Sequence, residues 1–368
     1  MEGPLVSVVV PAFNAAPTIG QTLDSIASQT YRSLDIIVID DGSTDETAAI
    51  VRHVCRSDAR MRVITQPNGG VAAARNTGIR ASKGGFVAFM DADDLWHPAK
   101  IEMQMEALLA EDADVALVYS PFRVIDMDGN VIASSRRHQA SGWVLYRHLH
   151  ANIVGNGSSV LVRKSVLQEL GGFDPWLREQ GAEGCEDLLM QLRIASRYKF
   201  REVPAYLVGY RKHRGNMSAD RDRMSRSGML AITRALSECG TPALATRGVL
   251  VRYEWKCFKI ATRRGDWRGA VAMLGRLRRH PALVFSALWN DLVTTMAART
   301  SRLVEPLRNA RVLRRAGLFK RRHFYDYSPT ESDVGGRRSL SARQRRLAAL
   351  DLVHRPDRKQ LTGDSAPR

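Results

Sequence analysis

The first half of the chain alternates short apolar runs with longer segments whose apolar residues recur at helical spacing. The apolar runs span residues 6–10, 35–40, 61–65, 85–90 and 114–120. Segments with helical spacing lie between them at residues 17–30, 43–54, 70–82 and 98–110. Strands that alternate with helices in this way predict a mostly parallel sheet with helices on both faces.

Polar residues follow several of the predicted strands at once. They occupy residues 11–14 after the first strand, 40–41 at the end of the second, and 91–94 after the strand at 85–90. In an open parallel sheet the carboxyl ends of the strands share one edge, and ligands bind there. Three polar clusters at one edge therefore predict a binding site.

The stretch GGFVAFMDADDLWHP places Asp91, Asp93 and Asp94 directly after a buried strand. Carboxylates this close repel one another, and each is costly to desolvate. A hard divalent cation such as Mg²⁺ or Mn²⁺, which takes oxygen ligands, would relieve that repulsion. The alternative is an acidic turn before a helix that starts at Pro98. These residues alone favour the two interpretations about equally.

Other features exclude several classes of protein. No G-x-G-x-x-G follows a strand, and no G-x-x-x-x-G-K-[ST] phosphate loop is present. The four cysteines form no C-x-x-C pair, which indicates free thiols in a reducing cytoplasm. The amino-terminal apolar run is too short for a signal peptide, and no uncharged apolar run is long enough for a transmembrane helix.

The pattern changes at about residue 221. Segments 243–262, 265–279 and 282–298 have helical spacing, and arginines are frequent from residue 301 onward. We expect three regions: an α/β domain that carries the predicted binding site at 1–220, a helical extension at 221–325, and a basic, disordered tail at 326–368. The net charge of +17 comes entirely from the part after residue 200, because acidic residues outnumber basic ones before it. The two parts therefore face different partners.

Four segments in order carry a family likeness: VSVVVPAFNAAPTIGQTLDSIASQT, IIVIDDGSTDET, NGGVAAARNTGIRASKGGFVAFMDADD and EDLLMQLR. Together they resemble the family 2 inverting glycosyltransferases, which have the GT-A fold. The likeness covers roughly residues 5–215, and the helical extension and tail lie outside it. It implies a nucleotide-sugar donor, a divalent metal and an inverting transfer.

The resemblance also implies roles for single residues. It assigns Asp91 and Asp93 to the D-x-D pair, in which Asp93 ligates the metal and Asp91 holds the metal or the ribose. It makes Asp187 the catalytic base. Phe13 stands where many relatives have Tyr, which keeps the stacking face and removes a hydroxyl. The nucleotide-binding residues that it implies are Pro11, Phe13, Asn14, Asp41, Arg75 and Asn76.

Two of these residues have further interpretations. Arg75 could equally pair with a carboxylate at the edge of the core. His213, in YRKHRGNMS, could be a third metal ligand or a hydrogen-bond donor to a phosphate. A lone His among Arg and Lys is more often a solvated loop residue. The resemblance places this stretch in the loop that closes over the diphosphate.

The sequence thus predicts a metal-dependent glycosyltransferase that uses a UDP-sugar and builds an envelope or extracellular glycan on a glycan or lipid-linked acceptor. We expect it in the cytoplasm, with its basic helices at 282–298 and 303–320 against an anionic membrane. The first alternative is a nucleotide-sugar-binding module without catalysis. The second is a nucleic-acid-binding protein, but the basic stretches carry few aromatics and match no such module.

Overall fold

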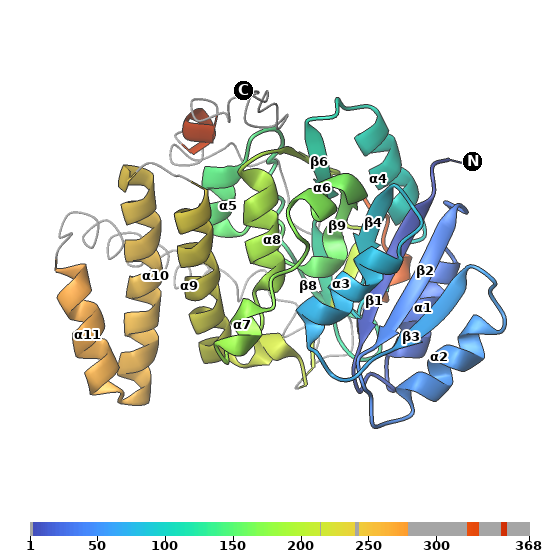
Figure 1. The fold of residues 1–368 in the computed structure, drawn as a ribbon, viewed down its shortest axis with the longest axis horizontal. Helices are drawn as coiled ribbons and strands as arrows, with labels where there is room; N and C mark the ends of the chain where they lie inside the picture. The colour runs from blue at the N-terminus through green and yellow to red at the C-terminus, as the bar shows by residue number, and fades with distance from the viewer. Residues whose placement is uncertain (1–2, 214, 240–242, 279–321, 331–346, 352–368) are drawn as a thin grey trace, which may run out of the picture.

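The computed structural model describes residues 3–213, 215–239, 243–278, 322–330 and 347–351. Its centre is a seven-stranded sheet in the order β10-β6-β9-β4-β1-β2-β3 (Figure 1). Only β9 runs antiparallel to its two neighbours, so the sheet is mostly parallel, as predicted. The strands are β1 (Val6–Ala12), β2 (Leu34–Asp40), β3 (Met61–Thr65), β4 (Phe86–Phe89), β6 (Val115–Tyr119), β9 (Val160–Arg163) and β10 (Lys199–Glu202).

Side chains alternate between the two faces of this sheet, and each face carries its own core. Val8 and Ile36 pack on one face with α1 (Ile19–Ala27), α2 (Thr47–Cys55) and α4 (Lys100–Leu109). Val9 and Ile37 pack on the other. The helices of that second face are α3 (Val71–Ala81), α5 (Leu145–Ala151), α6 (Lys164–Glu169) and α8 (Glu186–Ala195). Since both faces are covered, the central strands read as continuous apolar runs.

A second, four-stranded sheet in the order β5-β11-β7-β8 was not predicted. Its strands are β5 (Leu95–Trp96), β11 (Val208–Arg211), β7 (Phe122–Ile125) and β8 (Val131–Ser134). The expected helix at Pro98 begins two residues later, at Lys100, after a turn in which Lys100 N donates a hydrogen bond to His97 O at 2.9 Å. This small sheet lies at the edge of the main sheet where the aspartates are found.

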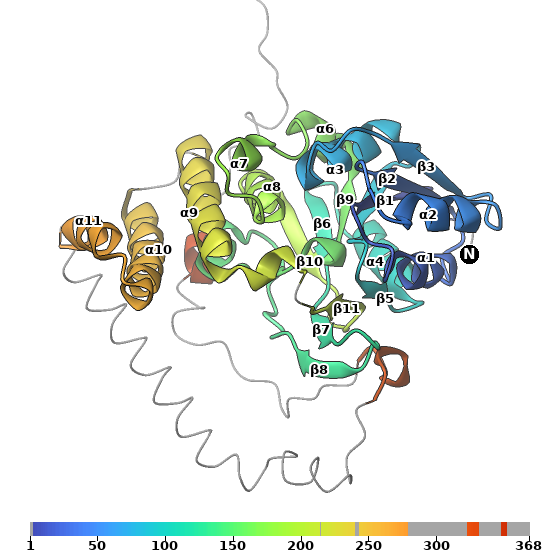
Figure 2. The ribbon, with the colours of Figure 1, turned by 90° about the horizontal axis from the view of Figure 1, so that it is seen from below.

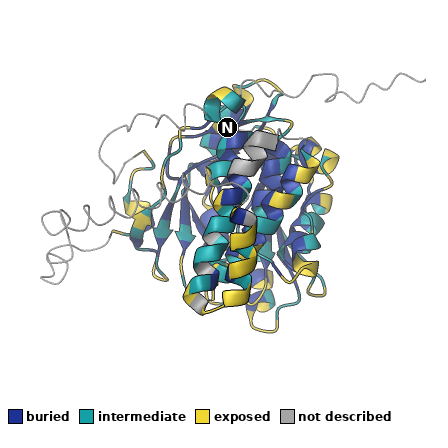
Figure 3. Ribbon diagram, turned by 90° about the vertical axis from the view of Figure 1, so that its left-hand side faces the viewer, coloured by how far each residue is buried: buried dark blue, intermediate teal, exposed yellow. Residues whose placement is uncertain are grey.

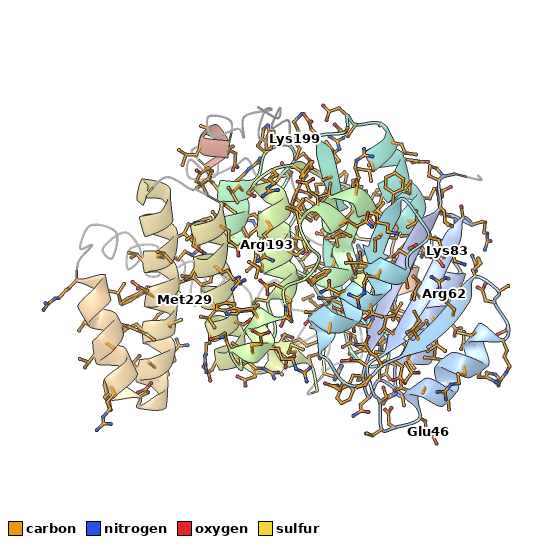
Figure 4. The ribbon with its side chains drawn as sticks, in the orientation of Figure 1. Glu46, Arg62, Lys83, Arg193, Lys199 and Met229 are labelled. Atoms are coloured by element: carbon orange, nitrogen blue, oxygen red, sulfur yellow. The ribbon has the colours of Figure 1, made fainter. Side chains whose placement is uncertain are left out.

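The helical extension packs on the α/β domain through α9 (Arg221–Glu238). Ile232 of α9 lies in one apolar cluster with Leu189 of α8. Arg193 projects from α8 toward the extension (Figure 4) and lies 2.7 Å from both Glu238 and Asp174. The extension therefore supports the helix that begins beside Asp187.

Two further helices follow, α10 (Ala243–Arg264) and α11 (Trp267–Leu277), which agree with two of the three predicted ones. The third, at 282–298, and the basic helix at 303–320 lie outside the described residues. Among the described helices, none combines the length and the apolar character needed to cross a membrane.

Two segments near the carboxyl terminus lie against the α/β domain. Phe324, in η4 (Phe324–Asp326), is buried against Ile125 of the small sheet, and Figure 2 shows η4 beside that sheet. Asp351 is buried and accepts hydrogen bonds from Tyr146 N at 2.7 Å and Arg147 Nε at 2.8 Å. Phe324 is the only buried residue of the 322–330 stretch, and the division of the chain at residue 325 stays a prediction.

Candidate active site

A cleft of about 660 Å³ opens at the carboxyl ends of β1, β2 and β4. The loop after β1 forms one wall, where Phe13 is half exposed. Asn14 has a positive φ of 49° and ties this loop to the next one: its Oδ1 accepts a hydrogen bond from Thr44 N at 2.8 Å, and its N donates to Ser43 Oγ. The structure places most of the predicted site residues in this cleft: Pro11, Phe13, Asn14, Asp41, Arg75, Asp91, Asp93, Asp187 and His213.

Asp41 holds the loop between β3 and α3 against the cleft. Its Oδ1 accepts hydrogen bonds from Gln66 Nε2 and Gly69 N, and its Oδ2 accepts one from Gly70 N at 2.8 Å. Gly70 has a φ of 84°, a conformation that a side chain disfavours. Asp41 is thus fixed by three donors and keeps further lone pairs for a ligand.

The three aspartates after β4 have different surroundings. Asp94 is fully buried and points away from the cleft, where it accepts hydrogen bonds from Ser158 Oγ at 2.6 Å and Arg211 N at 2.9 Å. Asp91 and Asp93 line the cleft. The run of three carboxylates therefore divides into one structural residue and one pair available to a ligand.

Asp93 contacts two side chains of the loop that follows β11. His213 Nε2 and Asn216 Nδ2 each lie 3.0 Å from Asp93 Oδ2. Burial and the neighbouring charge of Asp91 raise the pKa of Asp93, while His213 opposes the rise. His213 is thus a partner of Asp93, and its interpretation as a solvated loop residue is wrong.

Arg75 and Asn76, adjacent on α3, point in different directions. Arg75 is buried, and its Nη2 lies 2.7 Å from Asp91 Oδ1. Asn76 instead brackets the backbone of Phe173, because its Nδ2 donates to Phe173 O and its Oδ1 accepts from Phe173 N, both at 2.7 Å. Asn76 does not line the cleft, so its expected place beside the nucleotide is corrected: it fixes the loop before α7 (Trp176–Glu179).

Asp187 lies in the first turn of α8 and lines the same cleft as the aspartate pair. Burial raises the pKa of Asp187, and the positive charge of Arg75 partly offsets this rise. Burial likewise raises the pKa of Glu186, whose carboxylate accepts a hydrogen bond from Gly184 N. A buried carboxylate with a raised pKa has the properties of a general base.

Sequence reasoning missed several polar residues of the cleft. Asn156 is buried, and its Nδ2 has no hydrogen-bond partner within the described residues. Arg178 lies over the loop after β3, where its Nη2 donates to Asn68 Oδ1 at 2.8 Å. These residues belong to no motif, and the fold alone brings them to the cleft.

The carboxylate oxygens of the aspartate pair suit a hard divalent cation whose remaining ligands come from a substrate. Within the residues that the structure describes, no group of three or more His, Cys, Asp and Glu side chains is arranged to hold a metal by itself. Asp91 and Asp93 supply carboxylate oxygens, and burial together with their repulsion disfavours two uncompensated charges. Mg²⁺ is commonly held by one or two carboxylates plus substrate phosphates, which suits this pair.

A family model matches part of the chain. Residues 7–170 match the family model described as glycosyl transferase family 2. This segment belongs to glycosyl transferase family 2. The family 2 domain therefore covers the cleft walls from β1 to α6, and Asp187 and His213 lie beyond the matched segment.

Curated relatives of the family 2 domain include polysaccharide synthases. The chain is 35% identical to the chondroitin synthase of Pasteurella multocida (strain Pm70) over 131 residues, which cover 36% of this chain and 14% of the relative. It is 32% identical to the uncharacterized glycosyltransferase RP339 of Rickettsia prowazekii (strain Madrid E) over 180 residues, or 48% and 55% of the two chains. The chain thus spans about half or less of these relatives.

Two solved structures share the fold. S. aureus TarS 1–349 in complex with UDP-GlcNAc has a TM-score of 0.57 at 17% identity, covering 74% of this chain and 80% of TarS. The mannosyltransferase PcManGT of Pyrobaculum calidifontis, in complex with GDP-Man and Mn²⁺, has a TM-score of 0.54 at 23% identity, covering 81% and 82%. At these identities the likeness establishes the fold alone, and it confirms the predicted GT-A fold.

Proposed function

We propose that this chain transfers a sugar, with inversion, from a nucleotide-diphosphate sugar to a glycan or lipid-linked acceptor in cell-envelope or extracellular polysaccharide synthesis. One observation carries the proposal: a single cleft holds the aspartate pair and Asp187, with the buried Arg75 acting on both. The preferred candidate for the donor is a UDP-sugar, and the second candidate is a GDP-sugar. Relatives that make chondroitin and a fold neighbour solved with UDP-GlcNAc support this order.

The donor would lie along the ends of β1, β2 and β4. Phe13 offers an exposed ring on which a base can stack, and the Asp41 carboxylate lies at the same wall. Asp91 and Asp93 would hold Mg²⁺ or Mn²⁺, with His213 as a third ligand or as the partner that orients Asp93. When bound, that ion would offset the negative charge that grows on the leaving diphosphate.

Asp187 would take the proton of the acceptor hydroxyl. A hydroxyl is a weak nucleophile at neutral pH, and a carboxylate within hydrogen-bond reach removes its proton in the transition state. Attack from the side opposite the diphosphate inverts the anomeric carbon, so an α-linked donor gives a β-linked product. The charge of Arg75 helps to keep Asp187 ionised despite its burial.

We also propose that the protein is cytoplasmic and peripheral to an anionic membrane. The basic helices expected to bind lipid lie outside the described residues, but α11 carries a related feature. Its side chains Trp267, Val271 and Leu274 are exposed on one face, next to exposed Arg263 and Arg268. The α10–α11 pair faces the viewer in Figure 3, with exposed residues along it. An apolar stripe beside arginines suits a lipid interface.

A screen of nucleotide sugars tests the proposed function. UDP- and GDP-sugars should be titrated calorimetrically into the protein with Mn²⁺, with Mg²⁺ and with EDTA. Binding of one donor that depends on metal, followed by turnover with an acceptor extract, supports a transferase. Binding without any turnover would instead favour a nucleotide-sugar-binding module. Retention of nucleic acid through a nuclease-treated purification would favour the nucleic-acid alternative.

A further inference from the structure

A second hollow, of about 280 Å³, lies beside the active-site cleft. It is lined by the last residues of β6 and β10, Tyr119 and Glu202. Because β9 is antiparallel to both β4 and β6, those two strands run parallel to each other, and β10 is parallel to β6. Both hollows therefore open at the carboxyl edge of the same sheet.

The two hollows share a wall, the turn that follows α5. Asn152 and Gly155 line both of them. Asn152 turns the chain with a φ of 40°, and its Oδ1 accepts a hydrogen bond from Gly155 N at 3.0 Å. Gly155 is exposed and has a φ of 86°, and a Cβ there would meet the Phe122 ring at 2.8 Å. At Gly155 this shared wall is therefore backbone without a side chain, and an extended ligand can pass over it from one hollow to the other.

Glu202 presents an unused acceptor to the second hollow. The residue is buried, with 6% of its surface exposed. Its Oε2 accepts a hydrogen bond from Ala140 N at 2.9 Å and lies 3.1 Å from Tyr119 Oη. Its Oε1 is buried without a hydrogen-bond partner among the residues that the structure describes. A buried acceptor that receives no hydrogen bond is energetically costly. This oxygen therefore favours a ligand that donates a hydrogen bond to it.

We propose that this second hollow is a subsite for the sugar that precedes the reacting residue of the acceptor. The volume lies just below the range for drug-sized ligands, which suits one ring. Glu202 would accept a hydrogen bond from a hydroxyl, His138 and Arg136 of the lining offer donors, and Ile153 and Val154 offer apolar surface for the ring face. The inference rests on the proposed function, because it extends the acceptor path from the cleft across Gly155.

Binding of disaccharides tests the subsite. Saturation-transfer NMR on the full chain with UDP and Mn²⁺ should compare N,N′-diacetylchitobiose, cellobiose and mannobiose, each with its own monosaccharide. At least one disaccharide should bind more tightly than its monosaccharide, by about tenfold or more. His138→Trp, which fills the hollow, should abolish that gain. Glu202→Gln should reduce it by about tenfold, as expected for loss of a hydrogen bond to a charged group.

His53→Trp is the matched control, because His53 is exposed on α2, far along the chain from this hollow. It should leave the disaccharide gain unchanged. If no disaccharide binds more tightly than its monosaccharide, or if both pocket variants keep the gain, the hollow holds water only and the inference is wrong. Calorimetric binding of UDP-sugars is a separate readout: its absence in the unaltered protein would overturn the proposed function instead.

Discussion

Arg75 Nη2 lies 2.7 Å from Asp91 Oδ1, and the guanidinium stands 5.1 Å from the centre of the Phe173 ring. Burial alone would lower the pKa of Arg75, but the charges of Asp91 and Asp187 outweigh it and keep the guanidinium charged. One buried cation therefore serves both the aspartate pair and the expected base. Arg75 thus pairs with a carboxylate, as one of its two interpretations predicted, and that carboxylate is Asp91.

Replacing Arg75 with Met should move the acid limb of the rate–pH profile to higher pH. Arg75 lowers the pKa of Asp187, so its loss raises that pKa, and the base becomes protonated at a pH where it was ionised. The measurement is kcat as a function of pH at saturating donor. Arg80→Met, an exposed position on the same helix, is the control. An unchanged acid limb in Arg75→Met would contradict the coupling of these two residues.

Asp93→Ala should abolish transfer and metal-dependent donor binding, and Asp91→Ala should do nearly the same. Asp94→Asn should act differently, because Asp94 points away from the cleft. Its loss should lower the free energy of unfolding by about 1–3 kcal/mol, the usual effect of disturbing buried hydrogen bonds. Calorimetric titration of donor with Mn²⁺ and urea unfolding separate the two effects. Full turnover by Asp93→Ala in metal-free buffer would rule out the metal site.

His148 should make the protein less stable in acid. The residue is fully buried, its Nδ1 accepts a hydrogen bond from Ile153 N, and burial lowers its pKa to about 3. In the unfolded chain the ring is protonated below about pH 6.5, so stability present above that pH is lost as pH falls toward 3. The free energy of unfolding should fall by up to about 1.4 kcal/mol per pH unit from this residue.

His148→Gln keeps a hydrogen-bond acceptor but does not titrate. Urea unfolding at pH 7, 6, 5 and 4 should therefore show a smaller acid loss in His148→Gln than in the unaltered protein. Identical slopes for the two proteins would assign the acid loss to other groups.

Vesicle co-sedimentation tests the membrane proposal. Full-length protein should sediment with vesicles that contain anionic lipid, and binding should weaken at high salt because exposed charges are screened. A chain that ends near residue 300 should bind less, since it lacks the basic segment beyond. Trp267→Ser should also bind less if the exposed face of α11 touches lipid. Equal recovery of all proteins in the low-salt supernatant would exclude membrane contact.

The sequence predicted the main sheet and most of the cleft for a physical reason. Strands covered on both faces read as apolar runs, and polar residues at their carboxyl ends must meet at one edge. Asp91 and Asp93 could be recognised because three carboxylates after a buried strand are otherwise unfavourable. The exclusion of Asp94 from the cleft could not be predicted, since it depends on Ser158, more than 60 residues away.

The small sheet and the second hollow were beyond prediction for a related reason. β5 and β11 are two and four residues long and pair across more than 100 residues, so neither leaves a periodic signal. Asn76 shows the limit of a motif: it adjoins Arg75 in sequence, yet the helix turns it toward Phe173. Contacts of this kind come from tertiary packing and not from local pattern.

Acceptor-dependent release of nucleoside diphosphate by Asp187→Asn tests the central claim most directly. The account predicts that donor and metal bind this variant as they bind the unaltered protein, while turnover falls about 10²–10⁴-fold, the usual effect of losing a general base. Release by the unaltered protein should stop in EDTA. Turnover by Asp187→Asn at the unaltered rate, or loss of donor binding with no further loss of rate, would contradict the assignment of Asp187 as the base.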